Sequence, residues 1–175
     1  MFLYESVITA FQKARIQYLL VGGLAANLLG VERSTSDMDI LVAMTDANLR
    51  KIVMILKDLG YNVRQPVDPM GIADPSIRRD WIVNKNMKAF NFYRDESHEE
   101  VDIIIESPVS FAQAKKNAII KRIGKMKVCI VSPDDLIKMK KATGRDVDRW
   151  DIVQIKKIKR IYPSRSAVGK KKKSG

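Results

Sequence analysis

Two short signals, a glycine pair and a carboxylate pair, are separated by thirteen residues in this chain. Gly22 and Gly23 follow an apolar run, and Asp37 and Asp39 precede another. A glycine pair between a strand and a helix leaves backbone N–H groups open to a phosphate. Carboxylates two residues apart on a strand point to the same face. The spacing therefore predicts a phosphate-binding turn beside paired acidic side chains.

A third acidic residue, Asp102, interrupts a second apolar stretch. An ionised carboxylate beside a core strand is costly unless it is paired or bound to metal. A solvated turn would explain Asp37, but it does not explain Asp39 or Asp102. Because Mg²⁺ prefers carboxylates and substrate phosphates, we expect Asp37, Asp39 and Asp102 to be catalytic metal ligands. This combination suggests metal-assisted nucleotidyl transfer.

The composition bounds the class of protein. The chain has 175 residues and 46% hydrophobic content, which suits one domain with a real core, expected over residues 1–162. No apolar run approaches the length that spans a bilayer, so no membrane partner is expected. The one cysteine, Cys129, fits a reducing, cytoplasmic setting and is expected to be buried filler in a strand.

The net charge of +12 is concentrated near the C-terminus, because residues 155–175 hold many lysines and arginines and no acid. Residues 163–175 are expected to form a basic disordered tail. It is either a solubilising end or an electrostatic arm for RNA. No aromatic residue follows Tyr162 to stack on bases, which favours the first interpretation.

Periodicity and turn signals predict strands alternating with helices, which indicates an α/β (α+β) fold around one mixed sheet. Residues 65–75 are proline-rich and predict a loop. The expected helices are 3–16, 23–29, 46–59, 110–118, 133–143 and 147–161, and the expected strands are 18–21, 38–43, 61–64, 80–83, 89–93, 101–105 and 125–131.

Several polar residues near these signals are candidates for nucleotide binding. Arg33 can neutralise a phosphate or hold its own loop, and the hydroxyls of Thr35 and Ser36 can bind phosphate or cap turns. Lys140 and Arg145 either face the nucleotide or form helix-surface pairs with neighbouring acids. Both alternatives stay open.

The first block resembles the signature of the DNA-polymerase-β-like nucleotidyltransferase superfamily, in which a Gly-Gly or Gly-Ser turn precedes two acids separated by an apolar residue. It is similar to small stand-alone bacterial and archaeal members, including toxins of abortive-infection (type IV toxin–antitoxin) systems. A second block, 136–152, resembles the C-terminal stretch of that group, with matches at Lys140, Arg145 and Asp148.

The resemblance implies the minimal nucleotidyltransferase fold, with one mixed sheet flanked by helices and with C-terminal helices. It also implies two Mg²⁺ ions and an NTP substrate. Asp37 and Asp39 match metal ligands, and Asp102 matches the third acid, a metal ligand or a base. Gly22 and Gly23 match the phosphate-binding turn. The rivals for the third acid, given the long insert before it, are Glu100 and Glu106.

The predicted activity is Mg²⁺-dependent transfer of an NMP from an NTP to an acceptor hydroxyl. The acceptor is RNA such as tRNA, a protein or a small molecule. Among these, the basic tail weakly favours RNA. A toxin would also have an antitoxin protein as partner. The alternative is a catalytically silent nucleotide- or RNA-binding module on the same fold.

Overall fold

The computed structural model describes residues 3–161, and the predicted tail at 163–175 lies outside them. Its strands form one seven-stranded mixed sheet in the order β3-β4-β5-β2-β1-β7-β6. The strands are β1 (Tyr18–Leu20), β2 (Met38–Val42), β3 (Asn62–Val63), β4 (Ala89–Arg94), β5 (Glu99–Ile104), β6 (Ile119–Ile123) and β7 (Met126–Ile130). The α/β expectation and its mixed sheet are confirmed.

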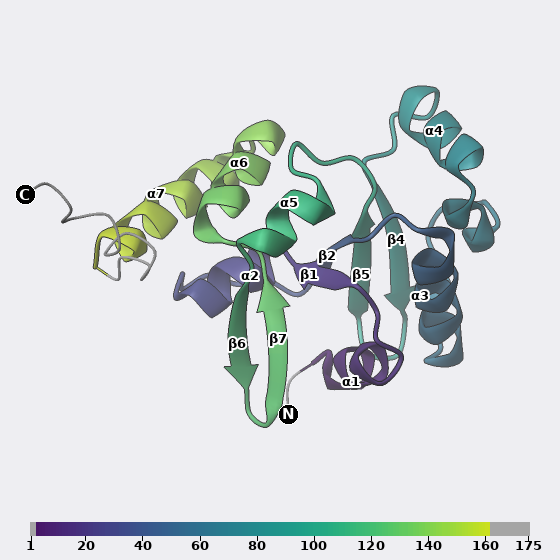
Figure 1. Cartoon of the computed structure of the whole chain (residues 1–175), viewed down its shortest axis with the longest axis horizontal. Helices are drawn as coiled ribbons and strands as arrows, with labels where there is room; N and C mark the ends of the chain where they lie inside the picture. Colours follow the sequence, from purple (N-terminus) through teal and green to yellow (C-terminus); the bar gives the residue numbers. More distant parts are fainter. Residues whose placement is uncertain (1–2, 162–175) are drawn as a thin grey trace, which may run out of the picture.

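The helices lie around this sheet, with α6 and α7 at one end of the molecule and α4 at the other (Figure 1). They are α1 (Glu5–Lys13), α2 (Gly22–Leu29), α3 (Asp46–Asp58), α4 (Pro75–Val83), α5 (Phe111–Lys116), α6 (Pro133–Thr143) and α7 (Asp146–Ile161), with a 3₁₀ helix η1 (Pro69–Ala73). Helix α1 contacts α3, and α2 contacts both α6 and α7. None of the helices within residues 3–161 has the length and apolar character that crossing a bilayer requires.

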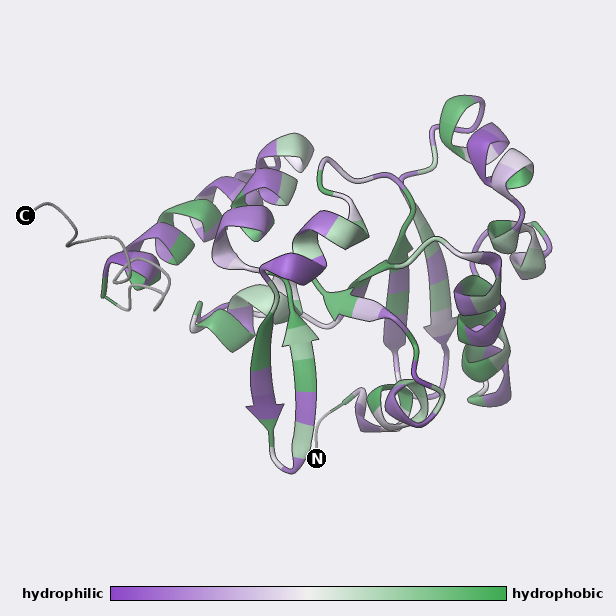
Figure 2. Cartoon of the chain, viewed as in Figure 1, coloured by the Kyte–Doolittle hydropathy of each residue, from purple (hydrophilic) through white to green (hydrophobic). Residues whose placement is uncertain are grey.

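The central strands consist mainly of apolar residues, which the surrounding helices bury. Four of the five residues of β2 are buried, and the exception is Asp39. Strand β2 pairs antiparallel with β1 and parallel with β5. Towards the edge the pattern changes: hydrophilic residues appear on β6 and β7 (Figure 2), and more exposed residues alternate with less exposed ones along both strands. A strand covered on one face only shows such alternation.

Local capping explains most helix boundaries. Ser110 accepts a hydrogen bond from the backbone N–H of Gln113 and forms a capping box that starts α5. Ser132 accepts from the backbone N–H of Asp135, with Pro133 at the first helical position of α6. Gly144 ends α6 with a φ of +66°.

The expected strand at 80–83 is wrong, because these residues end helix α4. The carboxylate of Asp74 accepts from the backbone N–H groups of Ser76 and Ile77 and so caps the helix. Pro75, the first helical residue, has the fixed φ that a helix start needs. The apolar residues of this stretch therefore follow a helical period, in which Trp81 packs against Phe90 of β4 with ring centroids 5.1 Å apart.

The structure corrects the sequence predictions at three further places. The loop expected at 65–75 contains η1, and strand β6 was missed. Strand β6 pairs antiparallel with β7 across the turn at Gly124. Cys129 is exposed rather than buried, because on β7 it is Val128 and Ile130 that point inwards.

The contact of α4 with the sheet gives a stability prediction. Phe90 is fully buried between Trp81 and Phe92, so Phe90→Ala is expected to lower the free energy of unfolding by about 3–5 kcal/mol. Urea denaturation measures it. Val83→Ala, at an exposed position of helix α4, is the control and should change stability by less than about 0.5 kcal/mol. Equal losses in the two variants would contradict the described packing.

Candidate active site

The parallel pairing of β2 with β5 places Asp39 directly opposite Asp102. On the other side of β5, Asn91 of β4 is the antiparallel partner of Asp102, and its amide Nδ2 donates to Asp102 Oδ1 at 2.7 Å. Three polar side chains thus follow one another across three adjacent strands. Residues opposite one another on neighbouring strands point to the same face, so the two carboxylates meet on one side of the sheet.

The glycine turn lies against this carboxylate pair. The backbone N–H of Val21 donates to the carbonyl oxygen of Asp39 at 3.0 Å, and helix α2 begins at Gly22 with a φ of +62°. A β-carbon at Gly22 would lie 2.6 Å from Cγ of Asp39. Glycine is therefore required both by the backbone conformation and by the close approach of the carboxylate.

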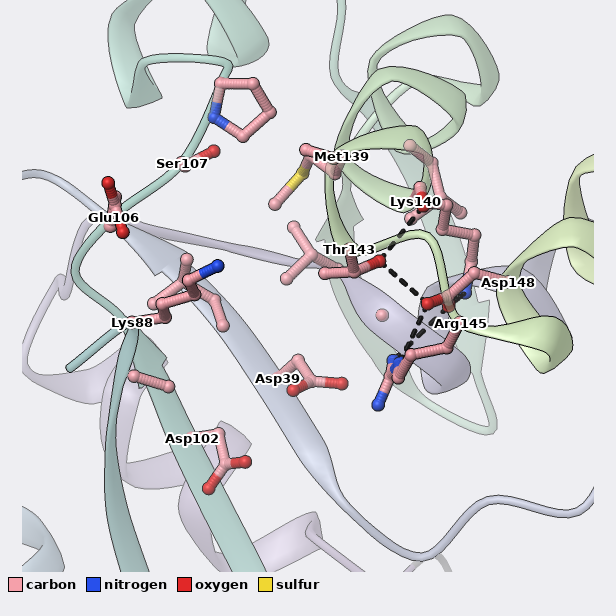
Figure 3. Close-up of a pocket in the computed structure, with 17 residues that line it drawn as sticks. Asp39, Lys88, Asp102, Glu106, Ser107, Met139, Lys140, Thr143, Arg145 and Asp148 are labelled. Carbon is pink, nitrogen blue, oxygen red and sulfur yellow. Dashed lines mark hydrogen bonds and ion pairs between the residues drawn. The ribbon is translucent and has the colours of Figure 1, made fainter. Parts of the chain in front are cut away.

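A cleft of about 650 Å³ opens above these residues. Asp39 and Asp102 lie on the sheet that forms its floor (Figure 3). Lys88, Glu106 and Ser107 line one side, at the ends of β4 and β5. The residues of the opposite side come from α6 and the start of α7, and Figure 3 shows Met139, Lys140, Thr143, Arg145 and Asp148 there.

The acidic pair sits in an unfavourable electrostatic environment. Burial, together with the nearby charges of Asp102 and Asp37, raises the pKa of Asp39 to about 6. Burial also raises the pKa of Asp102, and so does the charge of Asp37, although the hydrogen bond from Asn91 opposes this shift. Carboxylates that repel one another in a partly dry site favour a proton or a bound cation.

The residues present fit a divalent cation at the cleft floor. The donor set consists of hard carboxylate oxygens, which suit Mg²⁺, and the cleft leaves room for substrate phosphates as further ligands. Within residues 3–161 no group of three or more His, Cys, Asp or Glu side chains is arranged to hold a metal ion. The three-carboxylate site therefore stays a prediction, of which the structure joins two members, Asp39 and Asp102.

Asp37 lies just before β2 and does not line the cleft described above. Its carboxylate oxygen Oδ1 accepts from the hydroxyl of Ser36 at 2.7 Å. The carbonyl of Ser36 in turn accepts from the hydroxyl of Tyr4, which also donates to the carbonyl of Glu100 at 2.9 Å. These contacts anchor the loop that carries Asp37 to strand β5.

The loop candidates pack against the turn and α7. Thr35 touches Gly23, where a β-carbon would lie 2.9 Å from Cβ of Thr35. The guanidinium of Arg33 lies close by and forms an ion pair with Asp151 at 2.6 Å. Of the two expected roles for Arg33, the one seen in this structure is to hold the loop.

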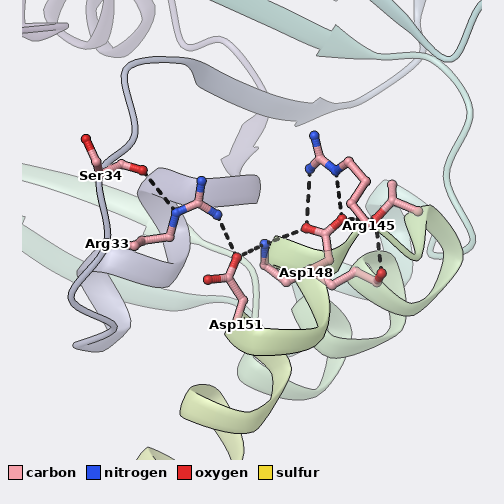
Figure 4. Close-up of polar contacts among 7 residues, drawn as sticks. Arg33, Ser34, Arg145, Asp148 and Asp151 are labelled. Atoms are coloured by element: carbon pink, nitrogen blue, oxygen red, sulfur yellow. Dashed lines mark hydrogen bonds and ion pairs between the residues drawn. The ribbon is translucent and has the colours of Figure 1, made fainter.

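Lys140 and Arg145 both line the cleft but differ in exposure. The Lys140 side chain is 4% exposed and pairs with Asp148 at 3.2 Å and Asp151 at 2.5 Å. Arg145 is 68% exposed and is held by Asp148 through Nε at 2.8 Å. Figure 4 shows these ion pairs beside the pair of Arg33 with Asp151, which links loop 31–37 to α7. Lys140 is thus a buried ion-pair partner, whereas Arg145 presents a cation to the cleft.

Two residues of the site were missed in the sequence, Lys88 and Asn91. Asn91 lies between two buried phenylalanines on β4. An uncharged polar residue flanked by apolar neighbours on a strand was the sequence feature that could have identified it. Lys88 precedes β4 and has no comparable signal. Its carbonyl accepts from the backbone N–H groups of Ile105 and Glu106, which places it at the cleft end of β5.

The fold is that of nucleotidyltransferases. The lincosamide antibiotic adenylyltransferase LnuA, solved with lincomycin bound, superposes with a TM-score of 0.59 at 18% identity over 87% of this chain and 93% of its own. ANT(2″)-Ia, solved in complex with adenylyl-2″-tobramycin, superposes with a TM-score of 0.57 at 14% identity, over 94% of this chain and 97% of its own. TM1012 from Thermotoga maritima superposes with a TM-score of 0.55 at 16% identity, over 87% of this chain and 88% of its own.

The likeness extends along most of both chains and is structural rather than sequential. No protein-family model matches the sequence, and no curated protein matches it. The fold expected from the resemblance is therefore confirmed by structure alone.

The raised pKa of Asp39 predicts a pH-dependent gain in stability for Asp39→Asn. The folded protein holds the Asp39 proton more tightly than the unfolded chain, so stability is lost as the pH rises through about 6. Above that pH the variant, which has no charge to bury, should be more stable by up to about 3 kcal/mol, and the gain should vanish near pH 4. Thermal unfolding at pH 8 and pH 4 in chelator measures it.

Asp58→Asn, at an exposed position of α3, is the control and should show no such pH-dependent gain. A wild-type protein at least as stable as Asp39→Asn at pH 8 would show that the carboxylate is already neutralised by other groups.

Gly22 predicts a second effect, with a matched glycine as control. Gly22 and Gly124 both have positive φ, so alanine is strained at either position, by roughly 1 kcal/mol. Nothing lies within 4 Å of a β-carbon at Gly124, whereas at Gly22 it would collide with Asp39. Gly22→Ala should therefore destabilise the protein by about 1–3 kcal/mol more than Gly124→Ala in urea denaturation. Equal losses would mean that Asp39 moves away freely.

Proposed function

We propose that the protein is a nucleotidyltransferase that moves an NMP from an NTP to the hydroxyl group of a small-molecule acceptor. The observation that carries the proposal is the pairing of Asp39 with Asp102 across β2 and β5, beside the glycine turn at Gly22. The structural likeness to adenylyltransferases over most of the chain supports the same reaction class.

Each part of the cleft has a role in this proposal. The backbone N–H groups at Gly22 and Gly23 receive the phosphates, and Arg145 contributes a positive charge that is already held in place by Asp148. Asp37 and Asp39 are the proposed metal ligands. A bound Mg²⁺ pair would neutralise the charge that develops on the transferred phosphoryl group and lower the pKa of the acceptor hydroxyl.

Asp102 is the residue best placed to face the acceptor. Its carboxylate is fixed by the hydrogen bond from Asn91, and it lies on β5, between Asp39 of β2 and Asn91 of β4. The acceptor oxygen must lose its proton as the new P–O bond forms and the bond to pyrophosphate breaks. Asp102 would accept that proton or share a metal ion with Asp39. Glu106, exposed at the cleft, is the rival for this role, whereas Glu100 pairs with Arg64 and does not line the cleft.

A small molecule is favoured as the acceptor by the cleft and by the similar structures. A volume of about 650 Å³ lies within the range of small-molecule sites, roughly 300–1,000 Å³. Much of the lining is apolar, with Ile104, Leu136 and Met139 among it. LnuA was solved with lincomycin and ANT(2″)-Ia with an adenylylated tobramycin, both of them small molecules.

RNA such as tRNA is the second candidate acceptor, and one observation favours it. Six cationic residues and no acid fall between 115 and 127, and none of the six forms an ion pair within residues 3–161. They are Lys115, Lys116, Lys121, Arg122, Lys125 and Lys127. The β6–β7 hairpin that carries four of them points away from α6 (Figure 1), so RNA bound there would reach the cleft only by bending around the sheet edge.

The activity prediction is tested with each labelled NTP and Mg²⁺, using lincomycin, tobramycin and total RNA as separate acceptors. Label should appear on a hydroxyl-bearing acceptor and should fall by about 100-fold or more in Asp39→Asn. Asp58→Asn is the matched control and should transfer at the wild-type rate, because Asp58 is exposed on α3. Chelation of divalent ions should abolish transfer in all three proteins.

The outcomes separate the candidate functions. Label on RNA but on no small molecule would replace the proposed acceptor. Nucleotide binding without any transfer would favour a catalytically silent module on the same fold. Transfer that survives Asp39→Asn would remove the catalytic assignment. The toxin role would further require a partner antitoxin that suppresses the transfer.

A further inference from the structure

A buried cluster of charges joins loop 31–37 to helices α6 and α7, which form one side of the cleft (Figure 4). Its centre is Asp151 of α7, whose side chain is 0% exposed. One oxygen, Oδ2, accepts from Arg33 at 2.6 Å and from Lys140 at 2.5 Å. The other oxygen, Oδ1, is buried and has no hydrogen-bond partner among the described residues. Asp151 does not itself line the cleft.

Stability alone is a poor explanation of this arrangement. Removing charges from water costs several kcal/mol per ion, and well-packed apolar residues often stabilise a core as well or better. An oxygen left without a partner adds a further cost. A buried charge cluster is better explained by the geometry that it imposes on the elements that it connects.

Those elements lead to the floor of the cleft and to one of its sides. Arg33 belongs to loop 31–37, which ends at Asp37 and leads directly into the strand that holds Asp39. Lys140 also contacts Asp148, and Asp148 holds Arg145 through two contacts, at 2.8 Å and 3.3 Å. Movement of Asp151 would therefore displace the loop that leads to the acidic floor, through Arg33. It would also displace the guanidinium of Arg145, through Lys140 and Asp148.

We infer that Asp151 is a positioning residue for nucleotidyl transfer. Without touching the substrate, it ties loop 31–37 to helix α7, so that the carboxylates of β2 and the guanidinium of Arg145 keep a fixed relation across the cleft. The kinetic part of this inference rests on the proposed function. The structural part, restraint of loop 31–37 by a residue more than a hundred positions away in the chain, does not.

The test compares Asp151→Asn with Asp146→Asn. Both changes remove one carboxylate charge from α7, but Asp146 is 96% exposed and, among residues 3–161, forms an ion pair only with Arg149, at 3.2 Å. Amide hydrogen exchange should speed up in residues 31–37 of Asp151→Asn, with the central strands still protected. In the same variant kcat/KM for NMP transfer should fall by about tenfold to hundredfold. Asp146→Asn should leave both quantities at wild-type values.

Arg33 provides a second route if Asp151→Asn does not fold. Arg33→Gln breaks the same contact from a side chain that is 18% exposed, and it should speed exchange in loop 31–37 in the same way. Arg33→Lys keeps the positive charge and should restore most of the protection. When Asp151→Asn folds, the double variant with Arg33→Gln should be no worse than the poorer single variant, because both act through one contact.

Three results would overturn the inference. The first is unchanged exchange in loop 31–37 together with unchanged kcat/KM in Asp151→Asn. The second is faster exchange spread evenly over all strands and helices, which would show a general contribution to stability. The third is an equal loss in Arg33→Lys and Arg33→Gln. If the wild-type protein transfers no nucleotide, the proposed function fails, and the exchange measurements still decide whether Asp151 positions the loop.

Discussion

The parallel contact between β2 and β5 is the constraint on which the rest of the site depends. It sets Asp39 and Asp102 side by side at the surface of an apolar sheet, where burial and mutual repulsion raise the pKa of both carboxyl groups. Such a floor is unfavourable for folding unless a cation neutralises it. The neighbouring features follow from this: Gly22 has no side chain where the carboxylate needs the space, and Asn91 holds the second acid in place.

The basic side of the cleft is built in a different way. Helices α6 and α7 are not part of the sheet, and their polar residues meet loop 31–37 through the ion pairs around Asp151. The sheet fixes the acids through backbone hydrogen bonds, whereas the cations depend on side-chain contacts. The two halves of the cleft therefore differ in rigidity by construction, and the charged cluster behind them is the principal link described between them.

Much of the fold could be predicted from the sequence because its signals are local. The glycine turn, the strand that contains Asp39 and the start of the helix expected at 133–143 each occupy a few adjacent residues. The strand predicted at 80–83 was wrong, since this short apolar run fits a helix and a strand equally until the cap at Asp74 decides. Strand β6 was missed because an edge strand with exposed Ile120 and Arg122 lacks a buried pattern of its own.

For the site, the sequence identified the acids and the glycines but not their partners. Asn91, Lys88 and Asp151 act through residues that are distant in the chain, and register or helix packing brings them together. The alternatives for Arg33 and Lys140 could not be separated without the position of Asp151. A lone sequence gives charge and spacing, whereas the choice between a phosphate ligand and an internal ion pair depends on tertiary contacts.

The contact between Arg33 and Asp151 also has a consequence for synthesis of the chain. Strand β2 finds its partner β5 only after some sixty further residues, and α7 comes later still. Contacts this remote in sequence close late, because long loops must be ordered first. The cleft is therefore completed only after α7 has been synthesised, and a chain interrupted before α7 would have its glycine turn and acids without the support that aligns them.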